Sequence, residues 1–198
     1  MISQLVIASN NPHKAEEIQT ILSDLEISVY TLNELNISIE IEETAETFQG
    51  NSLIKAKAIA ELTDLPVLAD DSGLIVPWLR GAPGVHSARY AGLNASDSQN
   101  RTKLIKELSR KGIKFTDAYF VCVMTLLFDD QMLQIEGVCR GQVKDYARGE
   151  YGFGYDPLFY SEGSLLSFAE IEPEEKHKIS HRGLALQKLK AELKKHKF

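Results

Sequence analysis

The spacing of apolar residues predicts that strands and helices alternate in the first half of the chain. The run QLVIA (4–8) is typical of a short buried strand, and so is LPVLAD (65–70). Between them, the stretch TAETFQGNSLIKAKAIAEL (44–62) predicts a helix. An earlier helix is expected after the loop SNNPHK (9–14), running to about Asp24. Its buried face is predicted from the helical spacing of Ala15, Ile18, Leu22 and Leu25.

The second half predicts a hairpin and two further helices. The segments AYFVCVMTLLF (118–128) and MLQIEGVCRGQV (132–143) flank a turn centred on Asp130 and Gln131. Ser96 and Gln99 have the spacing of a capping box, which predicts a helix through about Ser109. The stretch EPEEKHKISHRGLALQKLKAELKK (172–195) is predicted to end the chain in one amphipathic helix, with Leu186, Leu189 and Leu193 spaced for burial. We therefore expect an α/β chain with a mixed sheet, forming one domain over residues 1–198.

Composition and charge narrow the classes of function. The chain is 43% hydrophobic and 25% charged, with a net charge of -6. A negative net charge argues against a protein that coats nucleic acid or binds anionic membranes, because both surfaces select basic faces. A small anionic ligand is still compatible with this charge, provided that basic residues cluster locally. The longest apolar stretch has eleven residues, too few to span a bilayer, and the first ten residues do not resemble a signal peptide. We expect an intracellular, cytoplasmic protein with neither nucleic acid nor membrane as partner.

The two cysteines, Cys122 and Cys139, lie on either side of the predicted turn. A hairpin centred on Asp130 and Gln131 sets them opposite each other, which allows a disulfide. A reducing compartment and apolar neighbours favour two buried free thiols instead. The spacing of cysteines and histidines does not suggest a zinc site.

The stretch VLADDSG (67–73) allows two interpretations, because an apolar run ends there in two carboxylates, a serine and a glycine. Asp, Ser and Gly are turn residues, so the strand would simply stop. Alternatively, the strand delivers a carboxylate to a functional site, and a metal site is the first candidate. Adjacent side chains of a strand point to opposite faces, so only one of Asp70 and Asp71 is expected to face such a site.

Two further segments offer ligands for an anion or a metal. SNNPHK joins a strand to a helix, where free N–H groups and the helix dipole attract anions, but an ordinary N-cap explains it as well. The acidic stretch EIEETAE (40–46) is compatible with a solvated face. It also suits Mg²⁺, which takes one or two protein carboxylates and completes its shell with water and phosphate oxygens.

The last two candidate segments combine glycine, aromatic and basic residues. In YGFGYDP (151–157) the glycines permit close approach and the aromatic rings permit stacking, although loop aromatics also cap cores. KHKISHRG (176–183) places basic residues just before the expected helix, where they oppose its dipole. A local rule broken in this way is typical of a functional segment.

Taken in order, these segments resemble the inosine triphosphate pyrophosphatase family. The likeness rests on SNNPHK, EETAETFQGNSLIKAKA, LADDSGL, GAPGVHSARYAG, YGFGYDP and EEKHKISHRG, and spans Val6 to about Leu186. It implies Mg²⁺-dependent hydrolysis of ITP, dITP and XTP to the monophosphate and pyrophosphate, which cleanses the nucleotide pool. It also implies a homodimer, and an elongated mixed sheet flanked by helices, in two lobes with the active-site cleft between them. It favours the functional interpretation of VLADDSG.

The resemblance also implies residue roles. Glu42 and Asp71 match the magnesium-binding carboxylates, and Asp71 also matches the proton acceptor. The triphosphate-binding loop is matched by Ser9, Asn10, Asn11, Pro12, His13 and Lys14. Lys55 and Ser72 match residues that contact the substrate. The nucleoside side is matched by Phe153, Gly154, Tyr155, Asp156, Lys176, His181 and Arg182.

The sequence departs from the common pattern at four places. Asn10 stands where glycine is frequent, His86 where tyrosine is, Tyr151 where glycine is, and Pro77–Trp78 where an Asp-containing pair is usual. None of these is a proposed metal ligand, but His86 and Tyr151 can change the shape of the cleft.

Two alternatives stay open at this point. A related house-cleaning pyrophosphatase would share the chemistry and prefer another nucleotide. A non-catalytic nucleotide-binding protein would tolerate loss of the carboxylates, yet Glu42 and Asp71 are both present.

Overall fold

The computed structural model describes residues 2–9 and 11–196, and these divide into two compact units. Unit 1 contains the described residues of 1–71, 122–137 and 182–198. Unit 2 contains residues 72–121 and 138–181. The single domain predicted over residues 1–198 stays a prediction.

Within the described residues, six strands form one sheet in the order β2-β1-β3-β4-β5-β6. Strand β1 is parallel to both β2 and β3, whereas β5 and β6 are antiparallel. The sheet is therefore mixed, as predicted. The strands are β1 (Gln4–Ile7), β2 (Ser28–Thr31), β3 (Val67–Ile75), β4 (Phe115–Phe128), β5 (Gln131–Lys144) and β6 (Phe159–Ser161).

Five α-helices accompany the sheet in the part of the chain that is described. They are α1 (Pro12–Leu22), α2 (Phe48–Ala60), α3 (Asp97–Arg110), α4 (Pro173–Ile179) and α5 (His181–His196). Short 3-10 helices occur at Ser23–Leu25, Pro77–Leu79, Gly84–Arg89 and Asp156–Leu158. The predicted capping box is confirmed, because the Ser96 side chain accepts from the Gln99 N–H and the Gln99 side chain accepts from the Ser96 N–H. None of the helices in residues 2–9 and 11–196 has the length and apolar character to cross a membrane.

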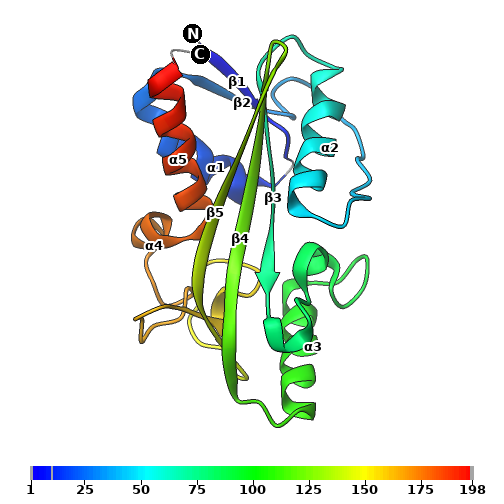
Figure 1. Cartoon of the computed structure of the whole chain (residues 1–198), viewed down its shortest axis with the longest axis vertical. Coiled ribbons are helices and arrows are strands. Elements are labelled where there is room, and N and C mark those ends of the chain that lie inside the picture. Colours follow the sequence, from blue (N-terminus) through cyan, green and yellow to red (C-terminus); the bar gives the residue numbers. More distant parts are fainter. Residues whose placement is uncertain (1, 10, 197–198) are drawn as a thin grey trace. The chain divides into compact units, whose positions relative to one another are not determined.

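The core of unit 1 lies on both faces of its sheet, since alternate strand residues enter different clusters. Leu5, Ile7 and Leu68 pack with the apolar faces of α1 and α5. Val67 and Ala69 pack on the other face with residues of α2. Figure 1 shows α1 and α5 on one side of β1 and β3, and α2 on the other. The predicted faces of the first and last helices are confirmed, with these residues in the core: Ala15, Ile18, Leu22, Leu186 and Leu189.

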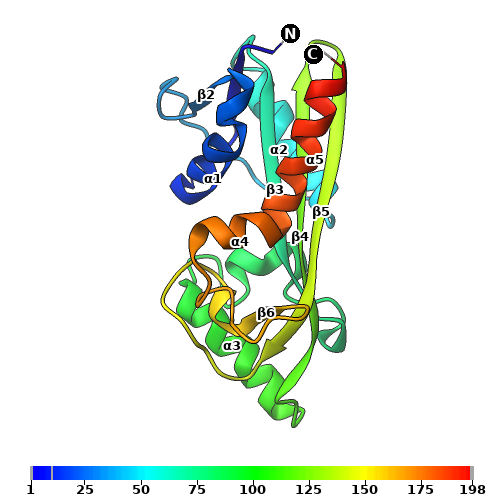
Figure 2. The same cartoon turned by 90° about the vertical axis from the view of Figure 1, so that its left-hand side faces the viewer.

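Unit 2 has a core of its own, built on aromatic rings. Phe159 makes edge-to-face contacts with Phe120 and Phe168, at centroid distances of 4.8 and 4.9 Å. Leu104 and Leu108 of α3 are fully buried in the same cluster. In this unit the loop before β6 passes beside α3 (Figure 2).

Three local expectations need correction. Strand β3 does not stop at Asp70 but continues to Ile75, so the turn interpretation of VLADDSG is wrong. The predicted last helix is two helices, because Ser180 is extended (φ -71°, ψ 156°) and ends α4. The β4–β5 turn is Asp129–Asp130, one residue earlier than expected, with Asp129 in the left-handed region at φ 49°.

Both cysteines are buried free thiols, as expected from the sequence. Burial raises the pKa of Cys122 to about 12, and the nearby Asp70 carboxylate acts in the same direction. Burial also raises the pKa of Cys139 to about 11. The neutral thiols therefore behave as small apolar side chains.

Candidate functional site

Strand β3 presents its two adjacent carboxylates to different faces of the sheet in unit 1. Asp70 follows the register of Leu68 and contacts side chains of α1 and α5, whereas Asp71 follows Val67 and Ala69 and contacts α2. This is the alternation that a strand imposes. The prediction that only one of the two carboxylates faces a given site therefore agrees with their separate partners.

Asp70 is the centre of a buried ion-pair network. Its Oδ2 lies 3.0 Å from the Lys14 Nζ and 3.4 Å from the Arg182 Nη2. The Arg182 Nη1 donates to Glu17 on α1, and the Arg182 side chain is only 2% exposed. Burial alone would raise the pKa of Asp70, but the Lys14 and Arg182 cations lower it well below its usual range. Asp70 is therefore a permanently charged partner of two cations, one of which belongs to the predicted phosphate loop.

Asp71 lies on the opposite face in a different electrostatic setting. Its Oδ1 is 3.5 Å from the Lys55 Nζ, and the same ammonium donates to the Glu43 Oε1 at 2.8 Å. Burial raises the pKa of Asp71; the Lys55 ammonium opposes this change and the Glu43 carboxylate adds to it. A buried carboxylate with a raised pKa beside a charged partner is typical of a proton acceptor.

The acidic stretch contributes Glu43 to this cluster. The Glu42 side chain is exposed, whereas Glu43 is half-buried against Lys55. The buried Asn51 on α2 explains the placement, because its Oδ1 accepts from the Ala45 N–H and ties the acidic stretch to the helix. Sequence reasoning chose Glu42 by family likeness; its role stays a prediction, and the geometry favours Glu43.

The loop between β1 and α1 combines an N-cap with a charged group. The Asn11 Oδ1 accepts from the Lys14 N–H at 3.4 Å, and the Asn11 N–H donates to the Ser9 Oγ at 3.1 Å. The ordinary N-cap interpretation is therefore correct for Asn11. Lys14, which belongs to the loop predicted to bind phosphate, also places its ammonium beside the Asp70 carboxylate. Asn10 lies outside the described residues, and the phosphate contacts predicted for Asn10, Pro12 and His13 stay predictions.

In unit 2, one carboxylate organises the predicted nucleoside segment. The Asp156 Oδ2 accepts from the Phe153 N–H at 2.9 Å and from the Lys176 Nζ at 2.6 Å. The same ammonium lies 5.1 Å from the centroid of the Phe153 ring. Gly152 has φ 74°, and a β-carbon there would collide with the Asp156 carboxylate, so glycine is required on both counts. Phe153, Asp156 and Lys176 thus form one connected group. The contacts predicted between these residues and a nucleoside stay predictions.

Other predicted nucleoside residues have structural contacts of their own in unit 2. Tyr155 is buried, and its hydroxyl donates to the Ser87 carbonyl at 2.9 Å. The buried His181 ring stacks on Phe120, with centroids 4.6 Å apart and planes at 11°. Ser72 is half-buried in β3. The substrate contacts predicted for these residues, and for Arg182 in unit 1, stay predictions.

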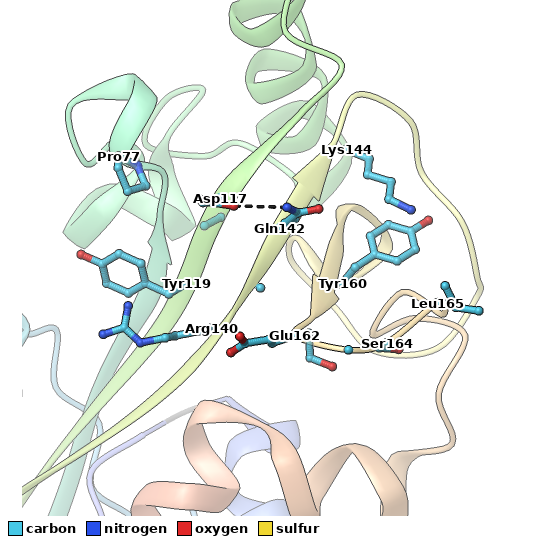
Figure 3. Close-up of a pocket in the computed structure, with 14 residues that line it drawn as sticks. Pro77, Asp117, Tyr119, Arg140, Gln142, Lys144, Tyr160, Glu162, Ser164 and Leu165 are labelled. Carbon is cyan, nitrogen blue, oxygen red and sulfur yellow. Dashed lines mark hydrogen bonds between the residues drawn. The ribbon is translucent and has the colours of Figure 1, made fainter.

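A groove of about 680 Å³ in unit 2 is a different feature (Figure 3). It is lined mainly by residues of β4, β5 and β6, and among the described residues it includes none of the predicted site residues. Its charged groups are mixed in sign: the Lys144 ammonium lies 3.6 Å from the Tyr160 ring centroid, and Asp117 accepts from Gln142 at 3.2 Å. This arrangement does not suit a triphosphate, so we do not place the substrate there.

Sequence reasoning assigned no individual role to five residues that make contacts in these clusters, although Glu43 lies in the acidic stretch that it singled out. Glu17, Glu43 and Asn51 belong to the unit 1 clusters. Asp97 and Arg101 contact Gly154 in unit 2. Glu17 and Arg101 occupy ordinary helical positions, and only their long-range contacts reveal a role.

Comparison with known proteins gives full-length matches. The sequence model of the Ham1 family matches residues 5–192. A dITP/XTP pyrophosphatase of Thermoanaerobacter sp. (strain X514) is 44% identical over 187 residues, 94% of each chain. Another, from Clostridium perfringens (strain 13 / Type A), is 43% identical over 200 residues, 98% of each.

Solved structures agree with these matches. A HAM1 protein from Coxiella burnetii superposes with a TM-score of 0.90 at 42% identity, covering 98% of this chain and 100% of that one. A nucleoside-triphosphatase / dITP/XTP pyrophosphatase from Mycobacterium abscessus gives a TM-score of 0.76 at 36% identity, covering 94% and 98%.

Proposed function

The chain belongs to the Ham1 family, and we propose that it hydrolyses ITP, dITP and XTP to the nucleoside monophosphate and pyrophosphate. The observation that carries this proposal is the 44% identity, over 94% of both chains, to a dITP/XTP pyrophosphatase. The two clusters around Asp71 and Asp156 support it. They provide a charged carboxylate site and an aromatic–cation segment, as a nucleoside triphosphate requires.

The carboxylates around Lys55 fit a divalent cation. Asp71 and Glu43 hold the Lys55 ammonium between them, so this donor set already binds positive charge. Mg²⁺ needs only one or two protein carboxylates besides water and phosphate oxygens. We therefore assign Asp71 and Glu43 as the residues that would hold it. The bound ion would neutralise the triphosphate charge and polarise the phosphate that reacts.

The residues of the chain supply positioning, charge and a proton acceptor. Lys14 and Lys55 would bind phosphate oxygens, together with N–H groups at the start of α1. Asp71 would take a proton from a water molecule while the oxygen of that water attacks the α-phosphorus. The α–β anhydride bond then breaks and pyrophosphate leaves.

The nucleoside would be held by the segment from Phe153 to Asp156. Stacking on Phe153 supplies affinity for any base, since every base has a π-face. Discrimination needs hydrogen-bond donors that face O6 of hypoxanthine or xanthine, because adenine presents an amino group there. His181 and Arg182 are the predicted donors; in the structure the terminal nitrogens of Arg182 bond to Glu17 and Asp70.

A nucleotide panel tests the substrate class. With Mg²⁺ present, kcat/KM is expected to be highest for ITP, dITP and XTP and much lower for ATP and CTP. Guanine also carries O6, so rejection of GTP requires a feature other than the O6 donors. A preference for another nucleotide with pyrophosphate release would indicate a related house-cleaning pyrophosphatase. Binding without turnover of any member of the panel would indicate a non-catalytic nucleotide-binding protein.

Two further properties belong to this proposal. The enzyme would act in the cytoplasm, where the nucleotide pool that it cleanses is found. The homodimer is proposed from the family resemblance alone, and sedimentation equilibrium of the purified chain tests it through the measured mass.

A further inference from the structure

The backbone N–H and carbonyl groups of Gly154 are both bound by side chains on one face of α3. Its N–H donates to the Asp97 Oδ2 at 2.6 Å, and its carbonyl oxygen accepts from the Arg101 Nη1 at 2.7 Å. Asp97 and Arg101 are four residues apart, so their side chains lie on the same face of the helix. Figure 2 shows this helix beside the loop that leads to β6. Charge-assisted bonds of this kind are the stronger class of hydrogen bond.

The rest of the segment is fixed by the Asp156 carboxylate. That group accepts from the Phe153 N–H and from Lys176, whose ammonium also faces the Phe153 ring. Gly154 itself has φ 59°, and a β-carbon there would meet nothing within 4 Å. Glycine is therefore required by the backbone angle, while the space beside it is open. Held by Asp97, Arg101 and Asp156, the segment has little freedom left before any nucleoside binds.

We propose that Asp97 and Arg101 are positioning residues for base recognition. The inference rests on the proposed function, in which the segment from Phe153 to Asp156 holds the nucleoside. A loop fixed in advance lowers the ordering cost of binding. It also keeps the Phe153 ring and the adjacent backbone groups in one geometry, so that only a matching base satisfies them.

The proposal predicts a specific kinetic pattern. We call the contacts of Asp97 and Arg101 with Gly154 the clamp. These contacts are present in the free enzyme and do not involve the reacting phosphates. Their loss is therefore expected to weaken substrate binding more than it slows the chemical step. Arg101→Met and Asp97→Asn are expected to raise KM for ITP about fivefold or more, with kcat within about twofold. A looser segment also adapts to other bases, so the ITP-to-ATP ratio of kcat/KM is expected to fall by a similar factor.

The experiment compares these variants with matched controls in the full-length protein. Lys106→Met removes an exposed positive charge from the same helix, and Asp130→Asn removes an exposed negative charge from the β4–β5 turn. Both controls are expected to keep KM and selectivity. Asp97→Glu keeps a carboxylate acceptor and is expected to restore part of the loss. Exchange of the Gly154 amide hydrogen gives a readout independent of turnover, and it is expected to accelerate in both clamp variants.

The outcomes separate the inference from the function on which it rests. Three results together support the inference: a higher KM for ITP, a lower ITP-to-ATP ratio of kcat/KM, and faster exchange of the Gly154 amide hydrogen. The two control variants must show none of these changes. Wild-type KM and selectivity in both clamp variants overturn it, even where melting temperatures fall, because the contacts are then only structural. An unmodified protein that hydrolyses no purine triphosphate overturns the proposed function and this inference together.

Discussion

Asp70 and Asp71 are neighbours in β3, yet their carboxylates have separate partners on opposite faces of the sheet in unit 1. Asp70 bonds to Lys14 and Arg182 on the side of α1 and α5. Asp71 faces Lys55 on α2. Two like charges can therefore stand side by side, because each has its own cation. The two carboxylates therefore have separate tasks in this account: Asp70 holds a buried network together, and Asp71 is the one proposed to serve the reaction.

Asp71→Asn is expected to remove turnover without unfolding the protein. The amide has nearly the same volume as the carboxylate, but it neither accepts a proton nor binds a cation as strongly. Loss of a general base typically costs ~10²–10⁴ in rate, so kcat for ITP should fall at least about a hundredfold. Steady-state kinetics and a thermal melt measure the two effects. A kcat within tenfold of the unmodified enzyme would contradict the assigned role.

Asp70→Asn is expected to act first on stability. The substitution leaves Lys14 and Arg182 without their shared anion, and Arg182 is fully buried. Breaking a buried ion pair costs about 3–5 kcal/mol. Urea unfolding should show this loss, whereas the exposed control Asp130→Asn should stay within about 0.5 kcal/mol. Unchanged stability, with the same kinetic loss as Asp71→Asn, would refute the separation of the two faces.

The structure explains which elements the sequence could predict. The faces of α1 and α5 and the Ser96 capping box depend on residues three or four positions apart, so local spacing is enough to find them. The extension of β3 from Asp70 to Ile75 could not be predicted from local spacing, because aspartate is a poor strand former and serine and glycine favour turns. Here its charges are compensated by Lys14, Arg182 and Lys55, which the fold brings from distant parts of the chain.

The candidate site also combines features that the sequence predicts with features that depend on long-range contacts. The segments around Asp71 and Phe153 contain motifs that resemble those of the family. The contacts that join Phe153, Asp156 and Lys176 are seen only in the structure. Spacing alone could not separate Glu42 from Glu43, since the choice depends on Asn51 tying the acidic stretch to α2.

The cysteines give a prediction with a pH dependence. In the folded chain the thiol pKa values are raised from 9.0 to about 12 for Cys122 and about 11 for Cys139, chiefly by burial. The unfolded chain therefore loses these protons first as pH rises. The stability that the neutral thiols contribute is present below pH 9 and is lost as pH rises through 11 to 12. The slope of unfolding free energy above pH 9 should flatten when both are replaced by alanine.

Thiol titration checks the same assignment independently. Both thiols should react slowly with Ellman's reagent at pH 8 in the folded protein, and completely in denaturant without reductant. Rapid reaction of either thiol in the folded protein would contradict its burial. Absence of free thiols in the denatured, unreduced protein would show that they form a disulfide.

The most direct test of the central claim is the identity of the products formed from ITP with Mg²⁺, followed by ³¹P NMR. The account predicts IMP and pyrophosphate in equal amounts from the unmodified protein, and neither from Asp71→Asn in the same time. IDP and orthophosphate as the products of the unmodified protein would show that another phosphoanhydride bond is cleaved, and would contradict the account.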